Sequence, residues 1–374
     1  MKHLIYADNA ATTQMDVDVF EAMKPYLLHE YGNASQPYSF ARQPKKAIQE
    51  ARESIASCIG ALPEEIYFTS GGTESDNWAI KGIAFRNYDH RATITTAFEH
   101  HAVLHACEAI ERLGCPVAYM LPDKRGFVSP DSLERYITDE TFLVSVMYAN
   151  NELGSIQPIK ELCKVAHDHG ALFHTDAVQA VGHVAINVND LGVDMLSASA
   201  HKFNGAKGVG FLYIRTGTTL PPYADGGAQE HGLRAGTENV AGIVSMAVAL
   251  KKNVNDLDKN QRHILKLEGL LLQALNESGI PYVRNGGDHT LPGVISLSFD
   301  GKDGEAILHR MDLMGVCIST GSACDSQNTE ISHVLQAIRM PESLAKGTIR
   351  ISLGKNNTAD DIDTIVTALR KILL

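Results

Sequence analysis

The sequence has no long apolar run and no recognisable targeting segment. No stretch approaches the roughly 20 consecutive apolar residues that a membrane span needs. The first eleven residues contain Asp8 and lack the long apolar centre of a signal peptide. These absences argue against a membrane protein and a secreted one, so we expect a cytoplasmic protein with no membrane partner.

The sequence also has fewer basic residues than acidic ones. The 374 residues include 33 Lys and Arg against 44 Asp and Glu, which gives a formal net charge of -11. A general binder of nucleic acids or membrane surfaces would show a basic footprint. We therefore expect no direct nucleic-acid partner, and small-molecule chemistry is favoured.

The six cysteines form no CxxC pair, and the histidines show no metal-ligand spacing, so we expect free thiols and no metal site. Five of the cysteines stand in apolar or helical stretches that are typical of a core. Cys324 differs, because the sequence GSACDSQN at 321–328 surrounds it with small and polar residues. This pattern indicates a loop in which a thiol is reachable.

What the chain does contain is a repeated alternation of apolar strand-like segments with helical ones, beginning at residue 65. Such alternation predicts an α/β fold with a mostly parallel sheet covered by helices. After residue 238 the pattern is helical to about residue 277, and a smaller α+β unit follows. We predict a large domain of residues 16–250 and a small domain formed by residues 1–15 and 251–374.

Lys202 stands between two apolar runs, residues 195–200 and 209–214, in a loop punctuated by glycines. The pattern predicts strand, turn, strand, with the lysine on the turn. A lysine at a strand end among small residues can lose hydration and become a nucleophilic amine that forms a Schiff base. Taken alone, the stretch fits a solvated surface lysine in a hairpin better.

Other polar residues follow predicted strands in the same way. Thr73, in TSGGTESD at 69–76, would begin a helix after a glycine pair, an arrangement that suits a phosphate or a plain strand-helix turn. Asp176 and Gln179 follow the strand that ends at residue 175, and Asp176 could pair with a buried cation or serve as a helix N-cap. His100 could stack on a planar ring or move protons, although a lone histidine is usually structural.

Together these residues indicate a kind of site that none of them indicates alone. They supply a phosphate cradle, a ring-stacking imidazole, an aspartate for a ring nitrogen, a donor for a ring oxygen and a Schiff-base lysine. This set is typical of a pyridoxal 5'-phosphate site. Ser199 and His201, which flank the lysine, are plausible further phosphate ligands.

Over nearly its whole length the chain resembles the cysteine desulfurases of the NifS/IscS type, which are class V aminotransferase-like, fold-type I pyridoxal phosphate enzymes. The resemblance is carried by collinear motifs: DNAATT (8–13), YGN (31–33), TSGGTES (69–75), EH (99–100), NNELG (150–154), HTDAVQ (174–179), SAHK (199–202), RAGT (234–237), STGSAC (319–324) and TIRISLG (348–354).

The resemblance implies a role for each matching residue that binds the cofactor. Lys202 would attach the cofactor and remove the α-proton, Asp176 would pair with the ring nitrogen, and His100 would stack on the ring and is a candidate for deprotonating a thiol. Gln179 and Asn151 would bond the ring's phenolic oxygen or the substrate. The phosphate ligands would be Thr73, Ser199 and His201, together with Thr237 from the neighbouring subunit of a homodimer.

The resemblance also implies the substrate and the reaction. Asn33 and Arg350 would bind the carboxylate of L-cysteine. Cys324 would accept the substrate sulfur as a persulfide, leaving L-alanine, and would pass the sulfur to an acceptor protein. Iron-sulfur cluster assembly, transfer RNA thiolation and DNA phosphorothioation all remain open as the pathway.

Two alternatives remain. One is another enzyme on the same scaffold, such as a selenocysteine lyase, another pyridoxal phosphate lyase or an aminotransferase. Cys324 argues against the aminotransferase, because transamination needs no thiol. The other is a sulfur-relay platform without turnover, which the retention of the catalytic set argues against.

The sequence also departs from the usual family pattern in three loops. Ala34, Gln36 and Tyr38 replace the usual residues after Asn33. Ala206 replaces a proline after the lysine loop glycine, and Ala228 and His231 depart from the usual GGGQERG.

Overall fold

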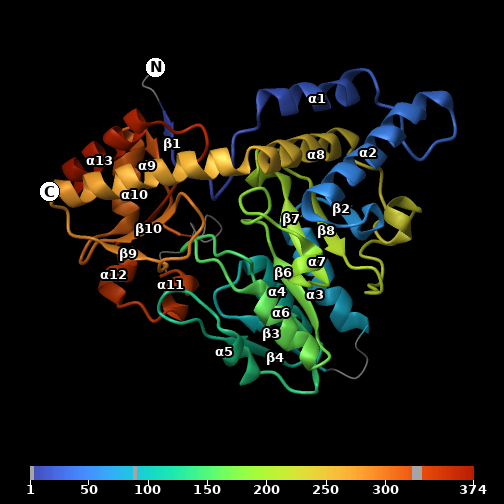
Figure 1. The fold of residues 1–374 in the computed structure, drawn as a ribbon, viewed down its shortest axis with the longest axis horizontal. Helices are drawn as coiled ribbons and strands as arrows, with labels where there is room; N and C mark the ends of the chain where they lie inside the picture. Colours follow the sequence, from blue (N-terminus) through green and yellow to red (C-terminus); the bar gives the residue numbers. More distant parts are fainter. Residues whose placement is uncertain (1–3, 87–90, 322–330) are drawn as a thin grey trace.

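A seven-stranded sheet forms the centre of the protein (Figure 1). The structure, a computed structural model, describes residues 4–86, 91–321 and 331–374. The strand order is β2 (Ile66–Thr69), β8 (Gly210–Ile214), β7 (Met195–Ser199), β6 (Leu172–Asp176), β5 (Thr141–Ser145), β3 (Ala92–Thr96) and β4 (Val117–Met120). From β7 to β4 the neighbours are parallel, and β8 is antiparallel to both of its neighbours. The predicted mostly parallel sheet is confirmed.

Helices cover both faces of this sheet, which explains why its strands read as continuous apolar runs. On β5, Leu143 packs into one core and Val144 into the other. One core lies under α3 (Gly72–Arg86) and α4 (His101–Glu111), and the other under α2 (Arg42–Ile59), α6 (Ile159–Asp168) and α8 (Val240–Asn255). The remaining helices of this unit are α1 (Val17–Leu28), α5 (Pro130–Glu134) and α7 (Val188–Leu191).

A second, smaller unit has its own hydrophobic core. Its antiparallel sheet has the order β12 (Thr348–Ser352), β10 (Val294–Ser298), β9 (Val283–Asn285), and the helices that pack into its core are α9 (Leu257–Ser278), α10 (Gly304–Leu313) and α13 (Ala359–Leu373). The short helices α11 (His333–Ala337) and α12 (Glu342–Lys346) lie in the same part of the chain, but their buried apolar side chains pack into the core of the large unit. The start of the chain joins this unit, because β1 (Ile5–Tyr6) pairs in parallel with β11 (Val316–Cys317). The exact domain boundaries stay a prediction.

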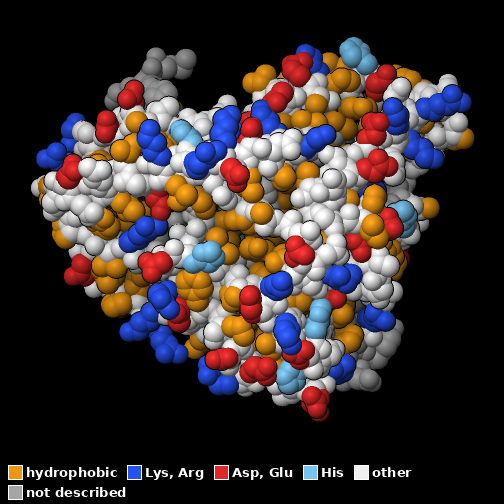
Figure 2. Space-filling model, viewed as in Figure 1, with side chains coloured by type: hydrophobic (Ala, Val, Ile, Leu, Met, Phe, Trp, Pro, Cys, Tyr) orange, Lys and Arg blue, Asp and Glu red, His pale blue; other side chains and the backbone are white. Residues whose placement is uncertain are grey.

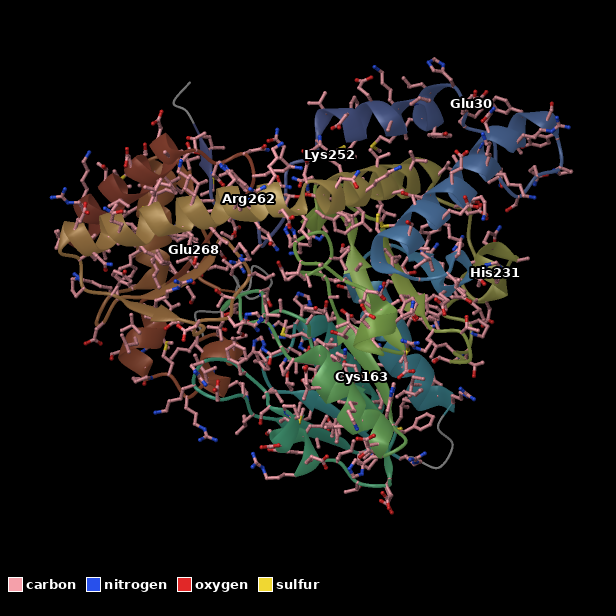
Figure 3. The ribbon with its side chains drawn as sticks, viewed as in Figure 1. Glu30, Cys163, His231, Lys252, Arg262 and Glu268 are labelled. Carbon is pink, nitrogen blue, oxygen red and sulfur yellow. The ribbon has the colours of Figure 1, made fainter. Side chains whose placement is uncertain are left out.

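The single helical stretch expected near residues 238–277 is two helices. Asp256 has φ -95° and ψ 9° and separates α8 from α9. The two helices run nearly end to end along the molecule, as Lys252 on α8 and Arg262 and Glu268 on α9 show (Figure 3). Within the described ranges, no helix is long and apolar enough to cross a membrane.

Candidate active site

A cavity of about 440 Å³ lies where β6, β7, α3 and β12 approach one another. Nine of the residues singled out in the sequence line it: Thr73, His100, Asn151, Asp176, Gln179, Ser199, His201, Lys202 and Arg350. The carboxyl ends of parallel strands share one edge of a sheet, which is where open α/β sheets bind ligands. The topology therefore gathers these residues from positions that are far apart in the chain.

Lys202 ends the short 3-10 turn Ala200–Lys202 between β7 and β8, as predicted. The two strands can pack this closely beside the turn because Gly210 has no side chain. A Cβ on Gly210 would lie 2.4 Å from the Ala198 carbonyl oxygen. The Lys202 Nζ donates to the carbonyl oxygens of Ala10 (2.6 Å) and Ala11 (2.9 Å). The amine is thus directed into the cavity by the start of the chain.

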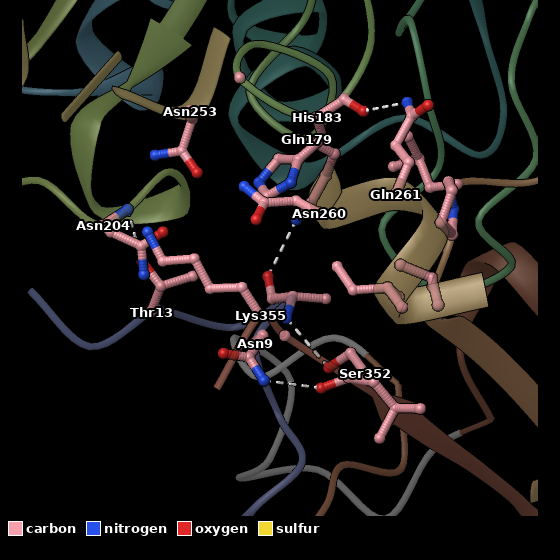
Figure 4. Close-up of a pocket in the computed structure, with 18 of the residues that line it drawn as sticks. Asn9, Thr13, Gln179, His183, Asn204, Asn253, Asn260, Gln261, Ser352 and Lys355 are labelled. Atoms are coloured by element: carbon pink, nitrogen blue, oxygen red, sulfur yellow. Dashed lines mark hydrogen bonds between the residues drawn. The ribbon is translucent and has the colours of Figure 1, made fainter. Parts of the chain in front are cut away.

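Residues 8–13, which we call the N-terminal strap, contribute Ala10, Ala11 and Thr12 to one wall of the cavity. Besides holding Lys202, the strap accepts a hydrogen bond from Gln179 Nε2 at Ala10 O (2.9 Å). The Thr12 hydroxyl lies 3.1 Å from His201 Nδ1. A second, smaller cavity of about 60 Å³ lies on the other side of the strap, among Asn9, Thr13, Gln179 and Ser352 (Figure 4). Sequence reasoning listed this segment only as a motif and gave it no role.

The start of α3 is shaped to receive an anion. Gly71 has φ +150°, and a Cβ on Gly72 would lie 2.5 Å from Val178 Cγ2, so the backbone turns into the helix only without side chains there. The helix N-terminus and the Thr73 hydroxyl border the cavity. Glu74 also borders it, but its carboxylate pairs with Arg234 (2.9 Å), which offsets its charge.

Asp176, at the end of β6, is suited to pairing with a cation in the cavity. Its side chain is buried, and Oδ1 accepts the Val178 N–H at 2.9 Å. Burial raises the pKa of Asp176 to about 6, against the opposing effects of the Val178 N–H and Lys202. A pyridinium nitrogen would supply the missing positive charge.

Two further buried acids, Asp76 and Glu99, stand near Asp176 and were missed by sequence reasoning. Burial raises the pKa of Glu99 to about 8, and burial followed by the charge of Asp176 raises the pKa of Asp76 well above its usual range. Several carboxylates cannot all ionise in one buried region. Burial raises the pKa of Asp176 less than that of Glu99, so Asp176 is the better suited of these two to carry a negative charge.

A neutral histidine connects these acids to the sheet. Burial lowers the pKa of His174 to about 3. Its Nδ1 lies 2.8 Å from Ser145 Oγ, and its Nε2 lies 3.0 Å from Ser197 Oγ and 3.6 Å from Asp76 Oδ1. The partners of His174 are therefore buried side chains of the protein itself.

Glu99→Gln should remove a pH dependence from the stability of the cofactor-free protein. With a pKa near 8 when folded against 4.5 as the ordinary value, folded wild type holds a proton that the unfolded chain lacks. Its free energy of unfolding should therefore fall, relative to Glu99→Gln, by about 1 kcal/mol per pH unit between these pKa values and level off above pH 8. Urea unfolding at several pH values measures this.

The exposed Glu108→Gln, on the helix α4 that follows Glu99, is the matched control and should follow wild type. Parallel curves for wild type and Glu99→Gln would mean that Glu99 is already ionised at neutral pH.

Three predicted residues do not line the cavity in the described part of the chain. Asn33 accepts the Ser35 N–H at 2.9 Å and lies in the loop after α1, and Thr237 is exposed in the loop before α8. These two loops meet, because Gln229 Nε2 donates to Ser35 Oγ (3.3 Å). Cys324 lies outside the described residues. The roles assigned to all three stay predictions.

His100 has a structural function besides any chemical one. Its Nδ1 accepts the Ala102 N–H at 3.1 Å and caps α4. A neutral imidazole that accepts at Nδ1 carries its proton on Nε2. The cap therefore fixes the tautomer that borders the cavity.

The departures from the family pattern have local explanations at two positions. The Ala206 N–H donates to Ser245 Oγ (3.2 Å), a bond that the usual proline could not make. His231 has φ 58°, a left-handed conformation, and its ring meets Tyr67 edge-on at 5.9 Å between centroids. Nothing in the structure explains the changes at Ala34, Gln36, Tyr38 and Ala228.

Comparisons with known proteins agree with this geometry. The family model described as aminotransferase class-V matches residues 5–365. The cysteine desulfurase IscS of Dictyoglomus turgidum is 48% identical over 375 residues, which cover 100% of this chain and 95% of that protein.

Solved structures give the same result. A structure titled NifS-like protein superposes with a TM-score of 0.94 at 37% identity and 99% coverage of both chains. A structure titled SspA in complex with cysteine gives a TM-score of 0.85 at 37% identity, covering 95% of this chain and 100% of that one. The chain therefore belongs to the class-V aminotransferase family and, within it, to the cysteine desulfurases of the NifS/IscS type.

Proposed function

We propose that the protein converts L-cysteine to L-alanine with pyridoxal phosphate and transfers the sulfur to Cys324. The observation that carries this proposal is the convergence of the Lys202 amine, the Asp176 carboxylate and the Arg350 guanidinium on one cavity. The 48% identity to a cysteine desulfurase over the whole chain supports it.

The cavity has a place for each part of the cofactor. Its phosphate would lie at the start of α3, with Thr73, Ser199 and His201 as ligands, and its ring nitrogen would face Asp176. Burial, and next the nearby Lys202, lower the pKa of His201 to about 4, so this side chain is a neutral hydrogen-bonding partner. When bound, pyridoxal phosphate supplies an electron sink for the negative charge that forms at the substrate α-carbon.

Residues of the chain would carry out the proton and binding steps. Arg350, assisted by Asn33, holds the carboxylate of L-cysteine, and Lys202 takes the α-proton. The strap carbonyls of Ala10 and Ala11 are placed to stabilise the resulting ammonium of Lys202, since they accept from its Nζ. His100, Asn151 and Gln179 border the ring position.

The sulfur step balances without an added oxidant. The Cys324 thiolate attacks the substrate sulfur, the carbon-sulfur bond breaks, and its electrons stay with the carbon fragment, which gains protons and leaves as alanine. Cys324 keeps the sulfur as a persulfide. An acceptor protein then takes this sulfur, and iron-sulfur cluster assembly and transfer RNA thiolation are two processes that would use it.

A second copy of the chain is the partner that the surface favours. Val17, Phe20, Leu27, Leu28 and Tyr31 on and after α1 are each at least 45% exposed, and apolar side chains gather over this helix (Figure 2). A homodimer would cover this face and bring the loops of Asn33 and Thr237 to a neighbouring cavity. Light scattering should then give twice the 40.6 kDa of one chain; a monomer mass would contradict it.

Incubation of the cofactor-loaded protein with L-cysteine and a thiol reductant tests the function. Alanine and sulfide should form in equal amounts, because each turnover yields one of each. Chromatography of amino acids and a colorimetric sulfide assay measure them. Pyruvate and ammonia in place of alanine would contradict the proposal.

A further inference from the structure

Arg350 is held from two sides although it is almost completely buried. Its side chain is 2% exposed. Nη1 donates to the Asn151 carbonyl oxygen (2.8 Å), and Nη2 donates to Asp8 Oδ1 (2.8 Å). A guanidinium so far from water requires a nearby anion. Asp8 supplies it within the described part of the chain.

Asp8 approaches this guanidinium from outside the cavity. Arg350 lines the large cavity, whereas Asp8 lines neither the large nor the small one among the described residues. The strap fixes Asp8 against β12, because Asn9 N–H donates to Ser352 O (3.1 Å) and Ala10 N–H donates to Ser352 Oγ (2.9 Å). Figure 4 shows Asn9 beside Ser352, two residues along the strand from Arg350.

We propose that Asp8 is a positioning residue that sets the affinity of the cavity for the substrate carboxylate. It orients the Arg350 guanidinium from behind and offsets part of its charge, so that an incoming carboxylate meets an aligned but partly neutralised partner. This inference rests on the proposed function for the identity of the substrate. The positioning role itself rests on the contact between Asp8 and Arg350.

The negative charge of Asp8 should weaken the binding of a carboxylate, whereas a purely structural contact predicts no such effect. With Asp8 and a substrate carboxylate present, two anions share one cation in a region of low dielectric, and their repulsion weakens binding. Asparagine at position 8 keeps an oxygen that can accept from Nη2 but carries no charge. The guanidinium should then stay aligned and attract carboxylates more strongly.

The experiment compares two small thiols on cofactor-loaded wild type and Asp8→Asn by titration calorimetry. 3-Mercaptopropionate has a carboxylate and no amine, and cysteamine has an amine and no carboxylate. Asp8→Asn should bind 3-mercaptopropionate about tenfold more tightly. Cysteamine binding should be unchanged, because it has no group for Arg350.

Steady-state kinetics give a second readout. Asp8→Asn should lower KM for L-cysteine without raising kcat, because a carboxylate contact made equally in the ground and transition states strengthens binding alone. Asp363→Asn, which removes one negative charge from an exposed position on α13, is the control and should behave as wild type.

Equal or weaker binding of 3-mercaptopropionate by Asp8→Asn would overturn the inference. The result is separate from the proposed function, since binding is measured without turnover. Failure of wild type to make alanine would instead count against the function.

Chemical rescue covers the case in which Asp8→Asn does not fold. In Asp8→Ala a small carboxylate can occupy the vacated space, so formate should raise the thermal midpoint of this variant more than that of wild type or Asp363→Asn. An equal effect of formate on all three would overturn the inference as well.

Discussion

Lys202→Ala should abolish the formation of alanine from L-cysteine. The Nζ of Lys202 is the amine that the strand-turn-strand unit and the two strap carbonyls direct into the cavity. Its removal would delete both of its proposed roles, the covalent attachment of the cofactor and the base for the α-proton. Loss of a positioned base alone lowers rates by about 10²- to 10⁴-fold, so alanine should fall at least this far.

The measurement is amino-acid chromatography after incubation with L-cysteine, with borohydride treatment as a second readout. Borohydride should fix the cofactor to wild type at Lys202 and leave the variant unlabelled. Lys164→Ala, an exposed lysine paired with Asp168 on α6, should match wild type. Alanine production at the wild-type rate by Lys202→Ala would remove this residue from its proposed role.

Cys324→Ser should reduce sulfide release to background while the cofactor absorbance stays. A serine hydroxyl cannot take the sulfur, because the nucleophile must be a thiolate that forms a persulfide bond. The substitution changes no proposed cofactor ligand, so cofactor binding should be unaffected. Mass spectrometry after L-cysteine should find an added sulfur on Cys324 of wild type only.

Cys317→Ser is the matched control, since Cys317 is a partly exposed free thiol on β11 a few residues earlier in the chain. It should keep full sulfide release. Undiminished release by Cys324→Ser would mean that the sulfur leaves without a persulfide on this residue.

The sequence predicted the parts of the site that depend on local signals. Lys202 on its turn, the glycine-opened start of α3 and Asp176 after a strand each follow from a few neighbouring residues. The topology places all of them at one sheet edge, which favours the cofactor-binding interpretation of these positions. The local pattern of Lys202 alone favoured a surface lysine.

The parts that sequence reasoning missed depend on contacts between distant segments. Asp76 and Glu99 are ordinary polar residues until burial places them near Asp176, and no pattern marks them. The division between α8 and α9 at Asp256 was missed because helical periodicity continues on both sides of it. The two cysteines that were expected in the core but lie only partly buried, Cys58 and Cys317, show the same limit.

The N-terminal strap has a consequence for how the protein is made. Asp8 and Ala10 meet Arg350 and Ser352, so the carboxylate site joins residues more than 340 positions apart. During synthesis the strap leaves the ribosome first, and Asp8 has no Arg350 to pair with until β12 follows. If Arg350 holds the substrate carboxylate as proposed, a growing chain lacks that contact, and we expect sulfur release only from finished molecules.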